Sequence, residues 1–338
     1  MKIAILAPIA WRTPPLKYGP WEQVASNITE GLVDKGMDVT LFATGDSNTK
    51  GKLSSVCEHA YAEDTTIDPK VAECLHISQL MEQANQFDII HNNYDFLPLS
   101  YSRLIKTPIV TTIHGFSSPK IIPVFKKYNS TSHYVSISDS NRNPDLNYEA
   151  TVYNGININE FIFSGEPDDY LLFFGRIHRD KGTYEAIEIA KKTKRKLVIS
   201  GFIQDQEYFN QKVKPYINDE DIVYVGNSGP KQRLKLLSQA CALLHPISFQ
   251  EPFGLSVVEA MACGTPVIAF NKGSMPELIL HEKTGFLVSN IDQAIEAISH
   301  IQHINRNECT KWVTSMFSRQ KMTEGYLKVY RKILHGNN

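Results

Sequence analysis

Short apolar runs alternate with segments of helical periodicity along almost the whole chain, and this alternation constrains the fold more than any other feature. The predicted strands are 3–8, 39–44, 88–92, 108–114, 133–138, 170–175, 196–201, 222–225, 242–246 and 266–270. Apolar residues at helical spacing predict helices over 22–35, 183–192, 231–240 and 255–263. Strands that alternate with helices form βαβ units, so the sequence predicts parallel sheets covered on both faces.

The alternation pauses once, in a polar stretch at residues 157–169 that contains Gly165 and Pro167. This stretch is predicted to be a linker that divides the 338 residues into an N-terminal domain, 1–156, and a C-terminal domain, 170–316. The expected fold class is α/β, with two Rossmann-like doubly wound domains facing each other across a cleft. Ligands of open α/β sheets bind beyond the carboxyl ends of the strands, so a shared site between the domains is expected.

Composition excludes several classes of protein. There are 35 Lys and Arg against 36 Asp and Glu, which argues against a protein that binds nucleic acid through a basic surface. No apolar run approaches the ~20 residues that a transmembrane helix needs, and the first apolar run is too short for a signal peptide. The 5 cysteines lack metal-ligand spacing, so we expect buried thiols, no metal site and a cytoplasmic protein.

Several familiar motifs are missing from the sequence. It contains no GxGxxG after the first predicted strand, no GxxxxGK[ST], no GxSxG and no HExxH. A dinucleotide-dependent oxidoreductase, a P-loop NTPase and an α/β-hydrolase therefore lose their usual sequence support.

The most informative motif runs from Glu251 to Glu259, between a predicted strand and a predicted helix. Gly254 precedes the helix, whose free N–H groups near residues 254–256 would offer a phosphate site. The carboxylates of Glu251 and Glu259 flank this site and can accept hydrogen bonds from paired sugar or ribose hydroxyls. The alternative interpretation, two solvated surface carboxylates, is less favoured because a strand, Pro252 and Gly254 set their positions.

A second motif, Phe174-Gly-Arg-Ile-His-Arg-Asp-Lys-Gly182, follows the predicted strand 170–175. Arg176 and Lys181 lie in the turn before the next predicted helix. Two fixed cations at the carboxyl edge of a sheet can neutralise a diphosphate leaving group without a metal ion. The alternative is an ordinary cluster of solvated charges.

Two further positions in the first half are candidates. Gly19 opens the first predicted helix, where a glycine allows close approach of a phosphate or a sugar, although a plain loop explains it equally well. His114 ends a predicted strand and could hydrogen bond a sugar hydroxyl or take part in proton transfer, whereas a structural role is equally favoured.

Lys120, Lys126 and Lys127 lie among apolar residues at 121–125. A solvated helix face is the favoured interpretation of this patch, and weak peripheral contact with an anionic membrane surface is the alternative.

In this order and spacing, the E-x7-E element, the FGR-x4-KG element, the His114-Gly115 pair and the glycine-bearing first loop resemble the family-four retaining glycosyltransferases of the GT-B fold, in their bacterial type. The resemblance covers essentially the whole chain. It implies that the amphipathic C-terminal helix, 317–336, packs back on the N-terminal domain, which would be the acceptor side, and that 170–316 binds a nucleotide sugar.

The resemblance also implies roles for the candidate residues. Glu259 would bind the ribose, and Arg176 and Lys181 would bind the diphosphate and stabilise it as it leaves. Glu251, with the backbone N–H groups of Phe253, Gly254 and Leu255, would hold the donor sugar and the distal phosphate. His114 would face the donor sugar, and Gly19 would place its backbone near the phosphates. One departure is Pro20, which stands where many members have a second glycine and which has no N–H to donate.

The function implied is transfer of a hexose, with retention, from a nucleoside diphosphate sugar to a hydroxyl of a glycan, small-molecule or lipid-linked acceptor. A UDP-sugar is the favoured donor, with no metal and no cofactor beyond this substrate. The alternatives are a donor of the GDP-mannose type, a GT-B sugar phosphorylase or epimerase, and a non-catalytic subunit that binds nucleotide sugars.

Overall fold

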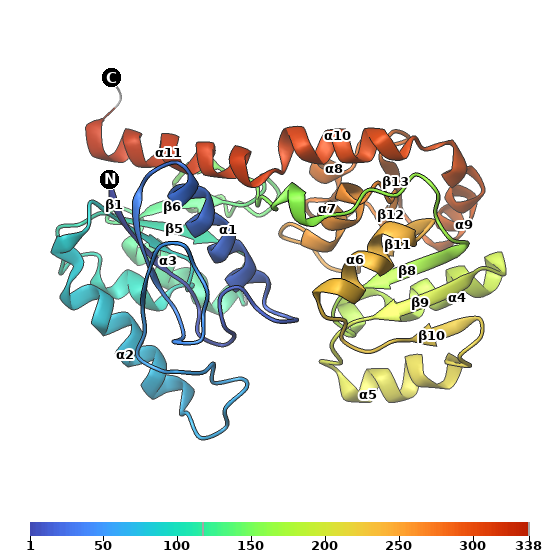
Figure 1. Cartoon of the computed structure of the whole chain (residues 1–338), viewed down its shortest axis with the longest axis horizontal. Coiled ribbons are helices and arrows are strands. Elements are labelled where there is room, and N and C mark those ends of the chain that lie inside the picture. The colour runs from blue at the N-terminus through green and yellow to red at the C-terminus, as the bar shows by residue number, and fades with distance from the viewer. Residues whose placement is uncertain (117, 337–338) are drawn as a thin grey trace. The chain divides into compact units, whose positions relative to one another are not determined.

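Every pair of neighbouring named strands in the described part of the chain runs parallel, as the alternation of strands and helices predicts. The structure, a computed structural model, describes residues 1–116 and 118–336. Its two sheets lie in two compact units (Figure 1). Unit 1 comprises Met1–Gly155 and the C-terminal segment that begins at Arg319, and unit 2 comprises Ile156–Ser318.

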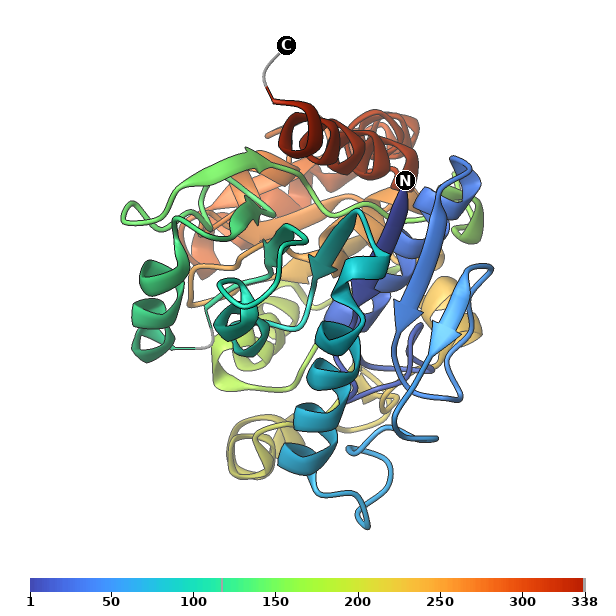
Figure 2. The ribbon, with the colours of Figure 1, turned by 90° about the vertical axis from the view of Figure 1, so that its left-hand side faces the viewer.

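Unit 1 contains a 7-stranded sheet in the order β3-β2-β1-β4-β5-β6-β7. The strands are β1 (Lys2–Leu6), β2 (Asp38–Phe42), β3 (Lys52–Ser54), β4 (Ile89–Asn92), β5 (Ile109–Ile113), β6 (His133–Ser136) and β7 (Tyr148–Thr151). The α-helices are α1 (Pro20–Asp34), α2 (Pro69–Glu82), α3 (Ile122–Tyr128) and α11 (Arg319–His335). Strands β4 and β5 are buried along their whole length, as expected of central strands in a parallel sheet. Helix α2 packs on β1 and lies in front of the strands in Figure 2.

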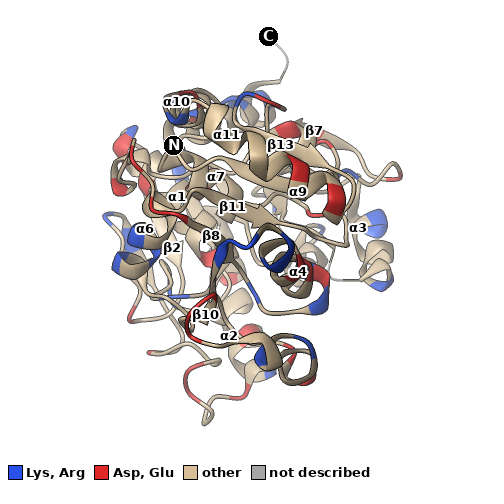
Figure 3. Ribbon diagram, turned by 90° about the vertical axis from the view of Figure 1, so that its right-hand side faces the viewer, with Lys and Arg blue, Asp and Glu red and all other residues tan. Residues whose placement is uncertain are grey.

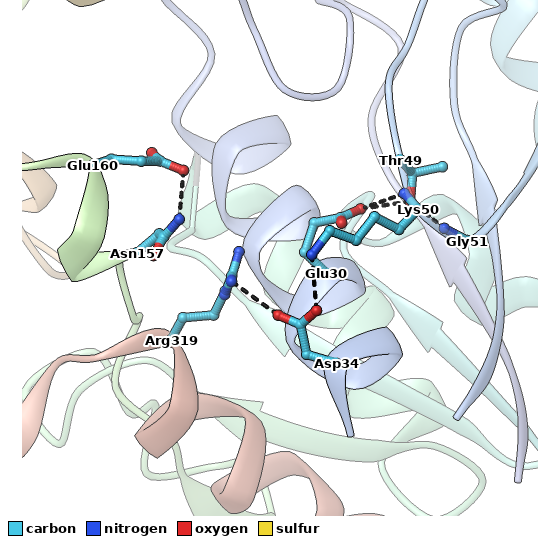
Figure 4. A network of polar contacts seen from close by, with 8 residues as sticks. All are labelled: Glu30, Asp34, Thr49, Lys50, Gly51, Asn157, Glu160 and Arg319. Carbon is cyan, nitrogen blue, oxygen red and sulfur yellow. Dashed lines mark hydrogen bonds and ion pairs between the residues drawn. The ribbon is translucent and has the colours of Figure 1, made fainter. Parts of the chain in front are cut away.

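Helix α11 packs against α1 although the two are far apart in the sequence (Figure 1). The helices approach closely at Gly31, where an added Cβ would lie 2.0 Å from the hydroxyl oxygen of Thr323. At the end of α1, the Asp34 carboxylate accepts from Arg319 and from Lys50, each at 2.9 Å (Figure 4). These exposed ion pairs add little stability, but they connect three segments of unit 1. Helix α11 is therefore part of unit 1 and packs on α1.

Unit 2 contains a 6-stranded sheet in the order β10-β9-β8-β11-β12-β13. The strands are β8 (Tyr170–Phe174), β9 (Lys196–Ser200), β10 (Ile222–Tyr224), β11 (Ala242–His245), β12 (Val267–Phe270) and β13 (Gly285–Val288). The α-helices are α4 (Thr183–Thr193), α5 (Gln206–Tyr208), α6 (Pro230–Gln239), α7 (Leu255–Ala262), α8 (Met275–Leu278), α9 (Ile291–His300) and α10 (Arg306–Met316). Both sheets have the doubly wound order of Rossmann-like domains, so the predicted α/β class is confirmed.

Basic residues gather at the end of α4 (Figure 3). Lys191 and Lys192 lie in its last turn, where positive charge interacts favourably with the helix dipole. Two basic residues at this end of α4 pair with nearby carboxylates. Lys192 lies 3.5 Å from Asp292, and Arg195 pairs with Asp169. Part of the positive charge at this end of α4 is therefore compensated by carboxylates.

The structure differs from the sequence-based expectation in several places, including the linker, the edge strands and the cysteines. Residues 157–169, predicted as a linker, belong to unit 2 and include the short 3₁₀ helix Ile158–Glu160. Strands β3, β7 and β13 were not predicted, because each is a sheet edge and lacks a long apolar run. The expectation of buried thiols is wrong for Cys74, which is exposed on α2, and holds for Cys263 and Cys309.

Candidate functional site

The loops after strands β8 and β11 of unit 2 are joined to each other. The amide of Ser248 donates to the carbonyl of Asp180 at 2.9 Å. Gly182 has a φ of 75°, and a Cβ at this position would lie 2.0 Å from the carbonyl oxygen of Pro246. Only glycine combines this left-handed conformation with so close an approach. The glycine that ends the FGR-x4-KG motif therefore allows the two loops to meet.

Lys181 and Glu251 form an ion pair where these loops meet. Their side chains are only 14% and 11% exposed, so both charges are largely removed from water. The Lys181 ammonium also lies 4.7 Å from the centre of the Phe249 ring, a favourable cation–π contact. The structure thus brings together one residue from each of the two main motifs.

His245, the last residue of β11, lies on the other side of the Glu251 carboxylate. Its Nε2 is 3.5 Å from Oε2 of Glu251, the oxygen that also contacts Lys181. Burial alone would raise the pKa of Glu251, but the charge of Lys181 and the contact with His245 outweigh it and lower the pKa to about 2. Glu251 is therefore a carboxylate throughout the physiological pH range.

The backbone around Glu251 is held by the loop after β12. The amide of Ser274 donates to the Glu251 carbonyl at 3.0 Å, and the amide of Gly273 donates to the Gln250 side chain at 2.7 Å. Helix α7 then begins at Leu255, with Gly254 as its N-cap at a φ of 103° and with no side-chain cap. The N-terminus of α7 therefore lies where the sequence predicts it, directly after the Glu251 loop.

The three residues predicted to contribute backbone N–H groups lie at this helix start. The Phe253 side chain is buried and packs edge-on against Phe317, with ring centres 6.0 Å apart. Gly254 and Leu255 are partly exposed. The Phe253 side chain thus anchors the segment in the core of unit 2.

Glu259 is buried within α7, with 6% of its surface exposed, so it is not the solvated surface residue of the alternative interpretation. Its Oε1 lies 3.4 Å from the Arg233 guanidinium on α6. Burial raises the pKa of Glu259, and the charge of Arg233 partly offsets that shift. Sequence reasoning missed Arg233 because a cation on an amphipathic helix has no pattern that indicates a buried partner.

Arg176 lies after β8, separate from the Lys181–Glu251 pair. Its guanidinium donates to the side chain of Gln204, which follows β9. The Gln204 amide is neutral, so this contact does not compensate the positive charge of Arg176. Neighbouring Arg179, in contrast, pairs with Asp205 at 3.0 Å. Arg176 therefore suits an anionic ligand better than Arg179 does.

In unit 1, Gly19 is the N-cap of α1 and has a φ of 151°. Pro20 is the first helical residue. An N–H at this position makes no intrahelical hydrogen bond, so a proline here costs the helix none. The departure from a second glycine thus has a structural explanation in the start of this helix.

His114 follows β5 and is buried, as expected of a strand-terminal residue at the carboxyl edge. Its Nε2 lies 3.0 Å from the Asn93 side-chain oxygen, and its ring stacks on Trp21 with the centres 5.5 Å apart. Burial lowers the pKa of His114 to about 3. The imidazole is therefore neutral at physiological pH. Trp21 lies in the first turn of α1, two residues after Gly19, so His114 and the Gly19 loop are neighbours within unit 1.

Glu22, also in the first turn of α1, was not singled out as a site residue. It is 3% exposed and accepts a hydrogen bond from the amide of Trp11 at 3.3 Å. Burial raises its pKa to about 7, although backbone hydrogen bonds act in the opposite direction. Glu22 connects the start of α1 to the loop after β1.

Within residues 1–116 and 118–336, no group of three or more His, Cys, Asp or Glu side chains is arranged to hold a metal ion. Over the same residues, no helix is both long enough and apolar enough to span a bilayer.

Comparison with known proteins supplies the family context. A sequence profile described as "Glycosyl transferases group 1" matches residues 157–315, and one described as "Glycosyltransferase Family 4" matches residues 21–160. A relative, an uncharacterised glycosyltransferase of Methanocaldococcus jannaschii, is 25% identical over 85% of each chain.

Solved structures with the same fold cover almost the entire chain. Sucrose-phosphate synthase from Thermosynechococcus elongatus superposes with a TM-score of 0.79 at 19% identity, over 99% of this chain and 100% of that chain. HepE from Anabaena, solved with UDP and glucose, gives a TM-score of 0.74 at 17% identity, over 97% of this chain and 98% of that one. At these identities the likeness demonstrates the GT-B fold.

Proposed function

The chain belongs to the group 1 and family 4 glycosyltransferases of the GT-B fold, and we propose that it transfers a hexose from a UDP-sugar to an acceptor hydroxyl. The proposed transfer retains the configuration at the anomeric carbon and needs no bound metal ion. The UDP preference is supported by HepE, a structural neighbour solved with UDP and glucose. Unit 2 is the proposed donor-binding unit.

The contact between Lys181 and Glu251 is the observation that carries this proposal. It places a cation and a permanently ionised carboxylate next to each other, directly before the N-terminus of α7. A cation and helix amides bind phosphate, whereas a carboxylate accepts hydrogen bonds from sugar hydroxyls. A sugar joined to a phosphate requires both kinds of group side by side.

The other candidate residues extend this assignment. We assign Glu259 to the ribose hydroxyls, Glu251 to the donor-sugar hydroxyls, and the amides of residues 253–255 to the distal phosphate. In unit 1, the backbone at Gly19 is assigned to the phosphates, and His114 is assigned to the donor sugar. Because His114 is neutral, its role is to hydrogen bond rather than to donate a proton from an imidazolium.

In the proposed reaction, the bond between the anomeric carbon and the diphosphate oxygen breaks as the acceptor oxygen bonds to the same face of that carbon. The departing phosphate oxygen takes the proton of the acceptor hydroxyl, so no protein carboxylate has to act as a nucleophile. Negative charge grows on the diphosphate as it leaves. Arg176 and Lys181 stabilise that charge from fixed positions, which is the largest contribution that such a site can make to the rate.

Calorimetric titration with UDP, GDP and ADP, in buffer containing EDTA, tests the donor assignment. We expect UDP to bind the native protein and to bind Glu259→Ala at least tenfold more weakly. Glu185→Ala, which removes a half-buried carboxylate of α4, is the matched control and should bind like the native protein. Binding of GDP instead of UDP would show that the donor is a GDP-sugar. No binding of any of the three nucleotides would contradict the proposed function.

Turnover of UDP-glucose, followed by proton NMR, tests the reaction itself. We expect slow release of glucose whose first-formed anomer is the one present in the donor. Production of a sugar phosphate from a disaccharide and inorganic phosphate would instead indicate a phosphorylase.

A further inference from the structure

The imidazole of His245 is buried beside charged groups and has no conventional hydrogen bond at Nε2. The side chain is 5% exposed, and Nε2 has no hydrogen-bond partner of normal geometry among the described residues. Its neighbour is Oε2 of Glu251, at 3.5 Å. A buried polar atom without a partner is destabilising, so its retention here calls for an explanation.

Glu251 already has a stronger partner at the same oxygen. Lys181, from the loop after β8, contacts Oε2 with a full positive charge. The charged groups that bear on the His245 imidazole are thus Glu251, in the loop after its own strand, and Lys181. Burial and the Lys181 charge lower the pKa of His245, while Glu251 acts in the opposite direction. The imidazole is therefore neutral while Lys181 occupies the carboxylate.

A bound diphosphate would change this balance. Its negative charge competes with Glu251 for the Lys181 ammonium, and it cancels the positive charge that disfavours protonation of His245. Glu251 would remain in place, nearly buried. A buried carboxylate that loses its partner is strongly destabilising, so a second donor close to Glu251 would stabilise it. His245 Nε2 lies at the same oxygen.

We propose that His245 is a positioning residue of the donor site, which takes up a proton and hydrogen bonds to Glu251 when a nucleoside diphosphate engages Lys181. The proton comes from the solvent, and the resulting imidazolium donates its Nε2–H to Oε2 of Glu251. The carboxylate then stays charged and oriented toward the donor-sugar hydroxyls. This inference rests on the proposed function, because it takes Lys181 as a diphosphate ligand.

Proton uptake during UDP binding tests the proposal. Calorimetric titrations at pH 7 in buffers of different ionisation enthalpy give the number of protons taken up per UDP. His245→Gln keeps an N–H donor but cannot be protonated, and the protons released by the UDP phosphate itself cancel in the comparison between the two proteins. His281→Gln, at an exposed histidine of the same unit, is the control.

We expect the native protein and His281→Gln to take up more protons than His245→Gln, by a measurable fraction of one proton. His245→Leu, which has no donor, should bind UDP about tenfold more weakly than His245→Gln. Equal proton counts and equal affinities in the native protein and both His245 variants would overturn this inference and leave the proposed function intact. Failure of the native protein to bind any nucleoside diphosphate would overturn the proposed function, and this inference with it.

A measurement without nucleotide gives an independent check. In Lys181→Met, His245 becomes the remaining cationic partner of Glu251, so its pKa should rise relative to the native protein. An NMR titration of the imidazole resonances, with thermal unfolding to verify that the variant is folded, follows this shift. A His245 pKa that is unchanged in folded Lys181→Met would contradict the coupling whatever the protein binds.

Discussion

The imidazole of His91 on β4 lies between two hydroxyls, with its Nδ1 2.6 Å from the Tyr330 oxygen on α11 and its Nε2 2.7 Å from the Thr112 oxygen on β5. Tyr326, one turn before Tyr330, contacts the same Thr112 hydroxyl at 2.8 Å. All four side chains are buried. The C-terminal helix is therefore joined to the centre of the first sheet by a polar network within the core, in addition to apolar packing.

Tyr330→Phe should destabilise unit 1, because it leaves the buried Nδ1 of His91 without its partner. We expect a loss of about 1–3 kcal/mol in the free energy of unfolding, measured by urea denaturation. Tyr101→Phe is the control, since it removes the hydroxyl of a partly exposed tyrosine in the same unit. Equal stability of the two variants would show that the network contributes nothing.

Gly182→Ala should disrupt the junction of the two loops that hold Lys181 and Glu251. The new Cβ would overlap the Pro246 carbonyl in addition to straining the backbone at a φ of 75°. Gly226→Ala is a matched control, because Gly226 has a φ of 78° and open space around its Cβ position. The control should lose about 1–2 kcal/mol from backbone strain alone. Thermal unfolding and UDP affinity should both be impaired further in Gly182→Ala.

Arg176→Ala should lower turnover without lowering stability. The Arg176 guanidinium contacts the neutral Gln204 side chain, so its removal leaves no charge unpaired. We expect kcat to fall by about 10²-fold, the usual effect of losing one group that stabilises transition-state charge. Arg179→Ala, in the same loop, should retain kcat. A drop in Tm as large as the drop in activity would indicate a structural role for Arg176 instead.

Glu22→Gln should change the pH dependence of stability. The pKa of Glu22 is about 7 in the folded protein against an ordinary value of 4.5, so the folded state holds the proton more tightly. The stabilisation from protonated Glu22 is complete below about pH 4.5 and is lost as the pH rises through 7. Relative to Glu22→Gln, the native protein should therefore become less stable between pH 5 and 8, by up to about 3 kcal/mol.

Urea denaturation at pH 5, 6, 7 and 8 measures that difference. Glu82→Gln, at an exposed carboxylate at the end of α2, is the control for the loss of a carboxylate elsewhere in unit 1. A Glu22→Gln difference that is constant with pH would mean that Glu22 is ionised in the folded state throughout.

The main elements of the fold were predictable from the sequence because buried parallel strands are continuous apolar runs. Strands such as β5 and β11 were found within one or two residues of their ends. Edge strands such as β3 (Lys52–Ser54) were not predicted, because solvent on one side removes the need for apolar residues. The start of α7 was also predictable, because Gly254 is a local marker of a helix N-terminus.

Pairing between side chains was decided by the tertiary structure. The sequence alone determined that Glu251 lies in a loop, that Glu259 lies in a helix and that Lys181 follows a strand. It could not reveal that Lys181 reaches Glu251, that Arg233 faces Glu259, or that His245 is buried beside the carboxylate. Periodicity reports the burial of one segment at a time, whereas charge, pKa and ligand preference depend on which segments meet. Those meetings are fixed by sheet order and by close contacts such as that of Gly182 with Pro246.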